Sequence, residues 1–177
     1  MKIFAIPAAS PESDYYYDSN YYLGPTAYTE GSKLYIGQGG EPEDKGAANL
    51  EAARPYFEKA IKAFDVVLGA KKPETIEKSL VNAMYVKGRS ELALDNLQFD
   101  PEAHQGLFVP TFEQLAALLS EKAELPDAQR GYLVDAYNYL GYHTYFKGDM
   151  AKAKSYFEKS LAIDPENETA NAFVSQM

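Results

Sequence analysis

The stretch Tyr137-Asn-Tyr-Leu-Gly-Tyr-His-Thr144, followed by Ala153-Lys-Ser-Tyr-Phe157 and then Asp164-Pro165, contains the clearest structural signal in this chain of 177 residues. Ala153 is small where two helices must approach each other closely, and Phe157 is large enough to fill the gap between them. Pro165 ends the pattern, because the residue before a proline avoids the helical region. The stretch therefore predicts two helices that pack against each other.

Local signals give the boundaries of these helices. The first helix is expected over 127–147, with Asp127 as its N-cap. Gly148-Asp149 is typical of a turn. A second helix is expected over 150–163, and a further one begins at 168 and runs to 174. The second helix has apolar residues spaced by three or four, as an amphipathic helix requires: Met150, Ala153, Phe157 and Leu161.

The same residues resemble the tetratricopeptide repeat, a helix-turn-helix unit with the pattern W-x2-L-G-x2-Y…A-x3-F…P. Tyr137 stands in for the first large aromatic residue, Leu140-Gly141 match, and Thr144 departs from the second aromatic position. A repeat of this kind cannot bury its apolar face alone and must stack on neighbours. The resemblance therefore implies an all-α solenoid of antiparallel helix pairs, which is more typical of a binding scaffold than of an enzyme.

An internal repeat supports this expectation. Residues 53–60 align with residues 153–160 at an offset of 100 positions (153 − 53), and five of the eight positions are identical. Three periods of about 34 residues would give a similar offset. The Ala and Phe of the first segment are therefore expected to pack as those of the second segment do, with Gly31 as the small residue that faces them.

The whole chain, 1–177, is expected to be a single helical domain. Its parts are a Tyr-rich irregular segment (1–24), a first repeat with an enlarged loop at 39–48 (25–68), degenerate middle helices (73–123), the clear repeat (126–165) and the start of a capping helix (166–177). Two alternatives remain for the middle: a repeat with its turn at Lys87-Gly88, or one long helix from Pro73 to Asn96. A helix over 111–123, capped by Thr111, is expected next, with Leu115, Leu118 and Leu119 facing inward. Both chain ends are abrupt for a repeat array, so the sequence is expected to be part of a longer protein.

The amino-acid composition excludes several classes of function. The formal net charge is −9 and the pI about 4.7, which argues against binding to nucleic acid or to an anionic membrane surface, because both require a positive field. No run of about 18 apolar residues occurs, so no membrane span is predicted. The absence of Cys excludes disulfides and thiolate chemistry, and is compatible with a cytoplasmic or a periplasmic location.

The resemblance also predicts a binding surface. In this family the first helix of each repeat lines the inner, concave face, and four residues of the first helix share one stripe on that face: Asp135, Asn138, Tyr142 and Tyr145. Tyr28 and Tyr35 belong to the equivalent stripe of the first unit. The functional interpretation is a groove that binds a protein or peptide segment. The alternative is that an adjacent helix covers the stripe.

The charge of this stripe restricts the ligand. Family members that bind chaperone tails hold a terminal carboxylate with Lys, Arg and Asn, whereas Asp135 would repel it. A neutral, cationic or sugar-like partner suits the stripe better. A carbohydrate-associated function is the alternative, since six Tyr lie between Tyr15 and Tyr28 and Tyr combines an apolar face with a hydroxyl group. These tyrosines are also explained by a role in covering the end of the solenoid. A purely structural role, in which the array drives self-association, is the third reading.

Catalysis is not predicted. His104 and His143 are far apart in the sequence, and no Ser or Thr occurs in a nucleophile motif. Gly37-Gln-Gly39-Gly40 lacks the Lys-Ser/Thr of a phosphate-binding loop. Neither His104 with Asp100 and Glu102, nor Asp164 with Glu166 and Glu168, has a diagnostic metal-ligand spacing. No cofactor is therefore expected.

Overall fold

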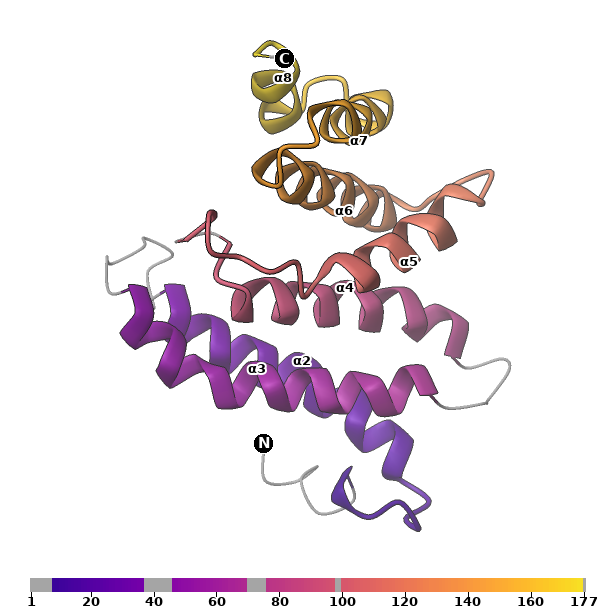
Figure 1. Cartoon of the computed structure of the whole chain (residues 1–177). Helices are drawn as coiled ribbons and strands as arrows, with labels where there is room; N and C mark the ends of the chain where they lie inside the picture. Colours follow the sequence, from indigo (N-terminus) through magenta and orange to yellow (C-terminus); the bar gives the residue numbers. More distant parts are fainter. Residues whose placement is uncertain (1–7, 37–45, 70–75, 98–99, 177) are drawn as a thin grey trace. The chain divides into compact units, whose positions relative to one another are not determined.

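The computed structural model describes residues 8–36, 46–69, 76–97 and 100–176. In these ranges the chain forms seven helices, labelled α2 to α8 (Figure 1). Contacts divide the chain into two compact units, residues 1–108 and residues 109–177. The described residues are all-α, with helices that pack in sequence, so the predicted fold class is confirmed.

The first unit contains α2 (Tyr16–Ile36), α3 (Gly46–Gly69) and α4 (Ile76–Leu94). Helices α2 and α3 form the most extensive pair, and α4 packs against both of them. One apolar cluster joins all three helices at their buried residues, namely Ala27, Ala60, Phe64, Val67 and Ala83. The helices are long enough to bury a continuous apolar stripe, which supplies most of the stability of a packed helix.

Two glycines of α2 set the distance between α2 and α3. A Cβ atom at Gly24 would lie 2.6 Å from Phe64 Cζ, and one at Gly31 would lie 3.0 Å from Phe57 Cε1. Residue numbers rise along α2 while those of the contacting Phe residues fall along α3, so the two helices are antiparallel. Both Phe side chains are fully buried. The expectation that Gly31 is the close-packing residue opposite Phe57 is confirmed.

The start of the first helix differs from the prediction. Residues 16–24 belong to α2, so the expectation of an irregular segment over 1–24 is wrong for that part; residues 1–7 lie outside the described residues. Pro25, which a local reading of the sequence would place at the first position of a helix, lies inside α2. The Thr26 hydroxyl donates to the carbonyl of Tyr22, and the Thr29 hydroxyl to that of Pro25. Packing of the Gly24 face against Phe64 favours a continuous helix in spite of the proline.

Helix α4 runs without a break through Lys87-Gly88. Gly88 lies within α4 and is buried, so the alternative of a repeat with a turn at Lys87-Gly88 is wrong, and the described part supports the long helix. Lys87 is fixed by an ion pair to Asp65 of α3 at 2.6 Å. Gly88 is followed by Arg89, which cannot cap a new helix as an Asp can. Residues 70–75 and residues 39–45 of the expected loop lie outside the described residues. Residues 46–48 belong to α3, so the expectation of a loop is wrong for that part.

A buried carboxylate organises the chain after α4. Asp95 accepts hydrogen bonds from three consecutive backbone N–H groups: those of Gln105 at 2.7 Å, Gly106 at 2.6 Å and Leu107 at 3.0 Å. Gly106 has a positive φ of 88°, which glycine adopts without strain. Asp95 thereby fixes the end of this loop beside the C-terminus of α4.

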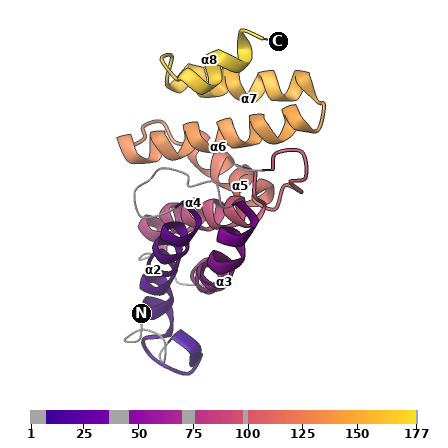
Figure 2. The ribbon, with the colours of Figure 1, turned by 90° about the vertical axis from the view of Figure 1, so that its left-hand side faces the viewer.

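The second unit contains α5 (Val109–Ser120), α6 (Asp127–Phe146), α7 (Met150–Ile163) and α8 (Glu168–Val174). The order α6, α7, α8 forms successive layers (Figure 2). The predicted helices at 150–163 and 168–174 are confirmed to the residue. Helix α5 begins before Thr111, so Thr111 is not its cap. Its predicted inward residues Leu115 and Leu119 are buried, and Leu118 is half-buried.

The caps of α6 and α7 show why their boundaries fall where they do. Asp127 is the first helical residue of α6, not its N-cap, and pairs with Arg130 one turn later. Gly148 adopts a φ of 82°, and Asp149 caps α7 by accepting the N–H of Lys152 at 3.0 Å. The turn predicted at Gly148-Asp149 is confirmed.

Candidate functional site

The predicted stripe of the second unit lies on α6, with spacings of three or four residues that keep its members on one face. Asn138 is buried, with 8% of its surface exposed. Asp135, Tyr142 and Tyr145 are half-buried. The structure therefore brings the four residues together on one helix, but it does not leave all of them open to solvent.

The Asn138 amide group is fixed by the cap of α8. The Asn167 Oδ1 atom accepts the backbone N–H of Ala170 at 3.0 Å, so this atom is an oxygen. Asn138 approaches the same oxygen at 3.1 Å and therefore presents its amino group. Within the described part of the chain, the remaining amide oxygen of Asn138 accepts no hydrogen bond. Asn138 thus combines a satisfied donor with a buried acceptor, an arrangement that costs about 1–3 kcal/mol unless a donor is supplied.

Helix α8 packs onto the tyrosines of the stripe through one residue. The Phe173 ring lies 4.8 Å from the Tyr142 ring and 5.0 Å from the Tyr145 ring, both in edge-to-face geometry. It also stacks on Phe157 at 4.8 Å. Such aromatic pairs contribute roughly 0.5–1.5 kcal/mol each. The adjacent helix therefore covers part of the stripe, as the alternative reading of the sequence anticipated.

The equivalent residues of the first unit, Tyr28 and Tyr35, differ in how accessible they are. Tyr35 is buried, and its hydroxyl donates to Asn96 Oδ1 at 3.0 Å. Burial raises the pKa of Tyr35 to about 12. Tyr28 is half-buried, with its ring 6.0 Å from that of Phe57. Of the two, only Tyr28 has a side chain that reaches the surface.

The Tyr-rich segment is largely part of α2. Tyr15 and Tyr22 are exposed by 67% and 55%, whereas Tyr21 is half-buried. The Tyr21 and Tyr22 rings meet at an interplanar angle of 72°. A sugar-stacking platform requires faces that are presented in parallel, so this pair does not form one. The N-terminal part of the segment is held by Asn20, which donates to the carbonyl of Ala8 at 3.0 Å.

Sequence reasoning missed a cluster on the α7 side of the second unit. The Lys159 ammonium group lies 5.7 Å from the Tyr137 ring centre and 5.6 Å from that of Tyr156. The Tyr156 hydroxyl group donates to Glu113 Oε1 at 3.3 Å. Burial, and then the Glu113 carboxylate, raise the pKa of Tyr156 to about 12. Only the Tyr-Phe-Glu-Lys sequence shared with the first repeat pointed to this cluster.

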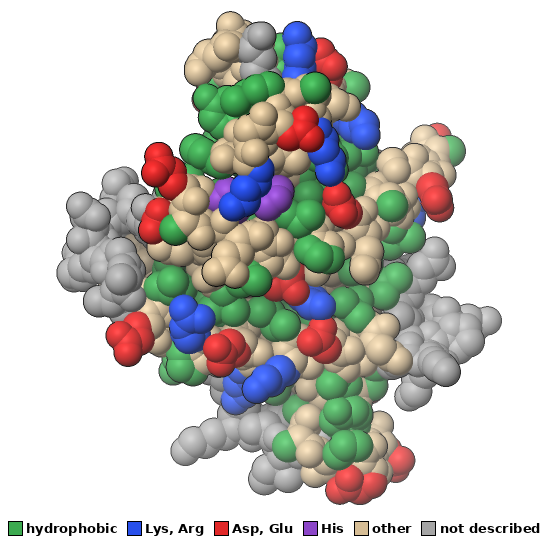
Figure 3. Space-filling model, viewed as in Figure 1, with side chains coloured by type: hydrophobic (Ala, Val, Ile, Leu, Met, Phe, Trp, Pro, Cys, Tyr) green, Lys and Arg blue, Asp and Glu red, His purple; other side chains and the backbone are tan. Residues whose placement is uncertain are grey.

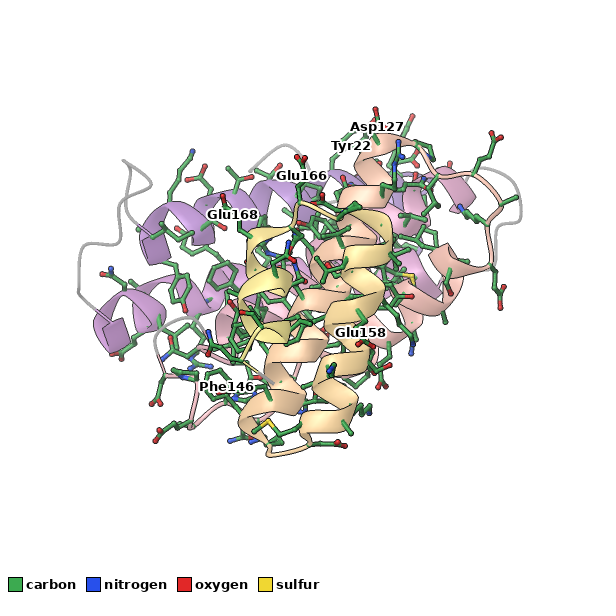
Figure 4. All side chains as sticks on the ribbon, turned by 90° about the horizontal axis from the view of Figure 1, so that it is seen from above. Tyr22, Asp127, Phe146, Glu158, Glu166 and Glu168 are labelled. Carbon is green, nitrogen blue, oxygen red and sulfur yellow. The ribbon has the colours of Figure 1, made fainter. Side chains whose placement is uncertain are left out.

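A second feature is the acidic edge, defined here as Asp164, Glu166 and Glu168, which runs from the C-cap of α7 to the first residue of α8. The sequence suggested these three residues only as metal ligands without a diagnostic spacing. Glu166 and Glu168 are exposed. They lie with Asp127 toward one end of the α6–α7 pair, whereas Phe146 lies toward the other (Figure 4). By contrast, acidic and basic side chains are interspersed on the face shown in Figure 3. The acidic edge is therefore a local feature of one end of this unit.

Metal binding gains no support in the described ranges. No group of three or more His, Asp or Glu side chains there is placed to hold a metal ion. His104 is buried, and its Nδ1 atom contacts the carbonyl oxygen of Pro101. Among the same residues, none of the helices is both long enough and apolar enough to cross a membrane.

The geometry of the second unit defines a helical-repeat protein: two antiparallel helices joined by a tight turn, with a Gly–Phe contact between them and a third helix on top. The family model described as tetratricopeptide repeat matches residues 134–167. Residues 134–167 are thus a tetratricopeptide repeat in a helical protein, as the sequence predicted. Comparisons with curated proteins and with solved structures gave no match. Such a repeat indicates a scaffold for protein–protein interaction, and families built on it are generally non-catalytic.

Proposed function

We propose that the chain is a non-catalytic scaffold that binds a segment of a protein or peptide partner on the first-helix face of its repeats. In the second unit this face is the α6 stripe of Asp135, Asn138, Tyr142 and Tyr145. The observation that carries the proposal is the tetratricopeptide repeat over residues 134–167. Fold alone identifies no partner, so the residues of the stripe must supply the recognition.

The stripe offers two kinds of contact. Asn138 and the tyrosine hydroxyl groups can exchange hydrogen bonds with a backbone, and the half-buried rings of Tyr142 and Tyr145 present apolar area at low entropic cost. Tyr28 is the corresponding candidate in the first unit. Tyr35 is omitted, because its buried hydroxyl is already bound to Asn96. The edge-to-face arrangement of Tyr21 and Tyr22 gives no specific reason to prefer a carbohydrate ligand.

A capture experiment tests this function. The wild-type chain, a stripe variant (Asp135→Asn, Tyr142→Phe, Tyr145→Phe) and a control variant (Tyr156→Phe, Glu158→Gln) are immobilised and exposed to lysate of the source organism. The stripe variant keeps every ring that packs against Phe173, and so removes only hydroxyl groups and one charge. Tyr156 and Glu158 lie on α7, outside the stripe.

Captured proteins are then compared by mass spectrometry. We expect at least one protein to be retained by the wild-type chain and the control variant and lost by the stripe variant. Retention of the same proteins by all three chains would contradict binding at the α6 stripe. Thermal unfolding of each chain verifies that the substitutions leave the fold intact.

A further inference from the structure

The α6–α7 pair forms a seat for an aromatic ring, which is filled by Phe173 of α8. Three rings surround that of Phe173 at centroid distances of 4.8, 5.0 and 4.8 Å, namely those of Tyr142, Tyr145 and Phe157. The seat is also held together without α8, because Phe157 lies edge-to-face against Tyr142 at 5.9 Å and packs against Gly141. Helices α6 and α7 therefore present the same seat to any segment that can fill it.

Two further contacts beside the seat match features of a helix. Asn138 of α6 donates to Asn167 Oδ1 at 3.1 Å, and the same oxygen caps α8 by accepting the N–H of Ala170 at 3.0 Å. Ala170 is fully buried, in one apolar cluster with Ala153 and Phe157 of α7. The pair thus receives a capping side chain, a small residue three positions later and an aromatic residue three positions after that, all on one face of a helix.

The present occupant of the seat, α8, is held by few contacts. It has seven residues, too few for a stable isolated helix, and it packs mainly against α7. Its inner residues Phe173 and Val174 are only half-buried. Within the described residues, no ion pair joins α8 to α6 or α7. A segment that makes the same contacts can therefore compete with α8 for this site.

We infer that the partner segment is a short amphipathic helix that takes the place of α8, with an aromatic side chain in the seat of Phe173. This inference rests on the proposed function and names the form of the partner. In the bound state Asn138, Tyr142 and Tyr145 contact the partner helix, and α8 covers them until it is displaced. Such an exchange is favourable only when the partner makes better contacts than α8 does. Docking of an amphipathic helix in an apolar groove is a common mode of peptide recognition.

A peptide made from α8 tests whether the seat accepts a helix from another molecule. The α8 peptide comprises residues 165–176 with a fluorescent label, and the alanine peptide is identical except for Ala in place of Phe173. Binding is measured by fluorescence polarisation for the full-length wild-type chain and for Phe173→Ala, which empties the seat. Gln176→Ala is the control chain, since Gln176 is exposed. Thermal unfolding verifies that each chain is folded.

We expect the α8 peptide to bind Phe173→Ala on the order of tenfold more tightly than it binds the wild-type chain or Gln176→Ala, because an occupied seat lowers the apparent affinity. The alanine peptide should show no such preference. Equal affinity of the α8 peptide for all three chains would overturn the inference, because binding would not depend on the seat. Failure to bind Phe173→Ala would overturn it as well, because the empty seat would not accept a helix.

Competition on the wild-type chain separates this inference from the proposed function. Proteins captured by the wild-type chain and lost by the stripe variant are washed with an excess of either peptide. The α8 peptide should elute them and the alanine peptide should not. Proteins that depend on the stripe but resist both peptides, or are eluted equally by both, would overturn the inference and leave the proposed function standing. If no captured protein depends on the stripe, the proposed function and the inference both fail.

Discussion

The Phe157 ring packs so closely against α6 that a Cβ atom at Gly141 would lie 2.8 Å from its Cζ atom. Only a glycine lets the two helices approach to this distance. The same relationship recurs between Gly31 and Phe57 in the first unit, where the burial pattern along 53–60 is nearly that along 153–160. A close contact between a glycine on one helix and a phenylalanine on the next is therefore a feature that both units of the chain share.

Replacing Gly141 with Ala is expected to lower the free energy of unfolding by about 1–3 kcal/mol, because the new methyl group overpacks a fully buried ring. The matched control is Gly131→Ala, in the same helix, where no atom lies within 4 Å of the new Cβ. That change is expected to stabilise the helix by up to about 1 kcal/mol. Urea denaturation measures both, and equal effects would contradict the role given to Gly141.

Gly24→Ala is expected to destabilise the first unit more than Gly31→Ala does. The Cβ atom at Gly24 would lie within 2.6 to 2.9 Å of three Phe64 ring atoms, whereas the closest approach at Gly31 is 3.0 Å. The cost for Gly24 is about 1–3 kcal/mol. Gly69→Ala, at an open position, serves as the control in thermal unfolding. The opposite order for Gly24 and Gly31 would refute this packing account.

Helix ends were predictable where the signal is local. Asp149 and Pro165 fix the limits of α7 because capping and the proline restriction depend only on neighbouring residues. Pro25 and Gly88 are equally strong local signals, yet both lie inside helices, since tertiary packing of α2 and α4 outweighs their cost. Proline and glycine therefore do not mark the end of a helix where a long helix is buried along one side.

The site was predictable only as a helix face. The spacing of Asp135, Asn138 and Tyr142 places them on one stripe whatever packs against it. That Phe173 covers the tyrosines, and that Asn167 engages Asn138, depends on how α8 returns over α6. Phe173 is the only aromatic residue after Phe157, which was the one available hint.

Asp95→Asn is expected to lower the free energy of unfolding by about 2–4 kcal/mol, because it removes the charge from three hydrogen bonds and turns a donor toward backbone N–H groups. Asp100→Asn is the control, since Asp100 is exposed and accepts one N–H at 3.2 Å. Hydrogen exchange should show faster exchange of the amides of residues 105–107 in Asp95→Asn only. If these amides exchange equally slowly in the variant, Asp95 does not hold the loop in place.

Alkaline conditions are expected to destabilise the fold through Tyr35. Its pKa is raised to about 12 in the folded state by burial, against about 10 when unfolded. The unfolded chain therefore loses this proton first, so stability is full below pH 10 and falls as the pH rises toward 12. In Tyr35→Phe, the free energy of unfolding measured by denaturation should fall less steeply as the pH rises above 10. At neutral pH it should be lower than that of the wild-type chain by about 0.5–1.5 kcal/mol, because the hydrogen bond is missing. Tyr15→Phe, at an exposed ring, should change neither.

Phe173→Ala is expected to release α8. This helix has seven residues, too few to persist without packing, and the Phe173 ring makes its contacts to Tyr142, Tyr145 and Phe157. Stability should fall by about 1–3 kcal/mol, less than for a fully buried Phe. Hydrogen exchange of α8 should accelerate in this variant and not in Gln176→Ala. Retained protection would mean that Ala170 and Val174 hold the helix without the ring.

Site-specific photo-crosslinking tests most directly whether a partner binds the α6 stripe. Benzoylphenylalanine is placed at Asp135 in one chain and at Glu158 in another, and each is irradiated with lysate of the source organism. The account predicts a covalent adduct with a defined protein from position 135 and none with that protein from position 158. Adducts of equal yield at both positions, or only at 158, would contradict binding on the first-helix face.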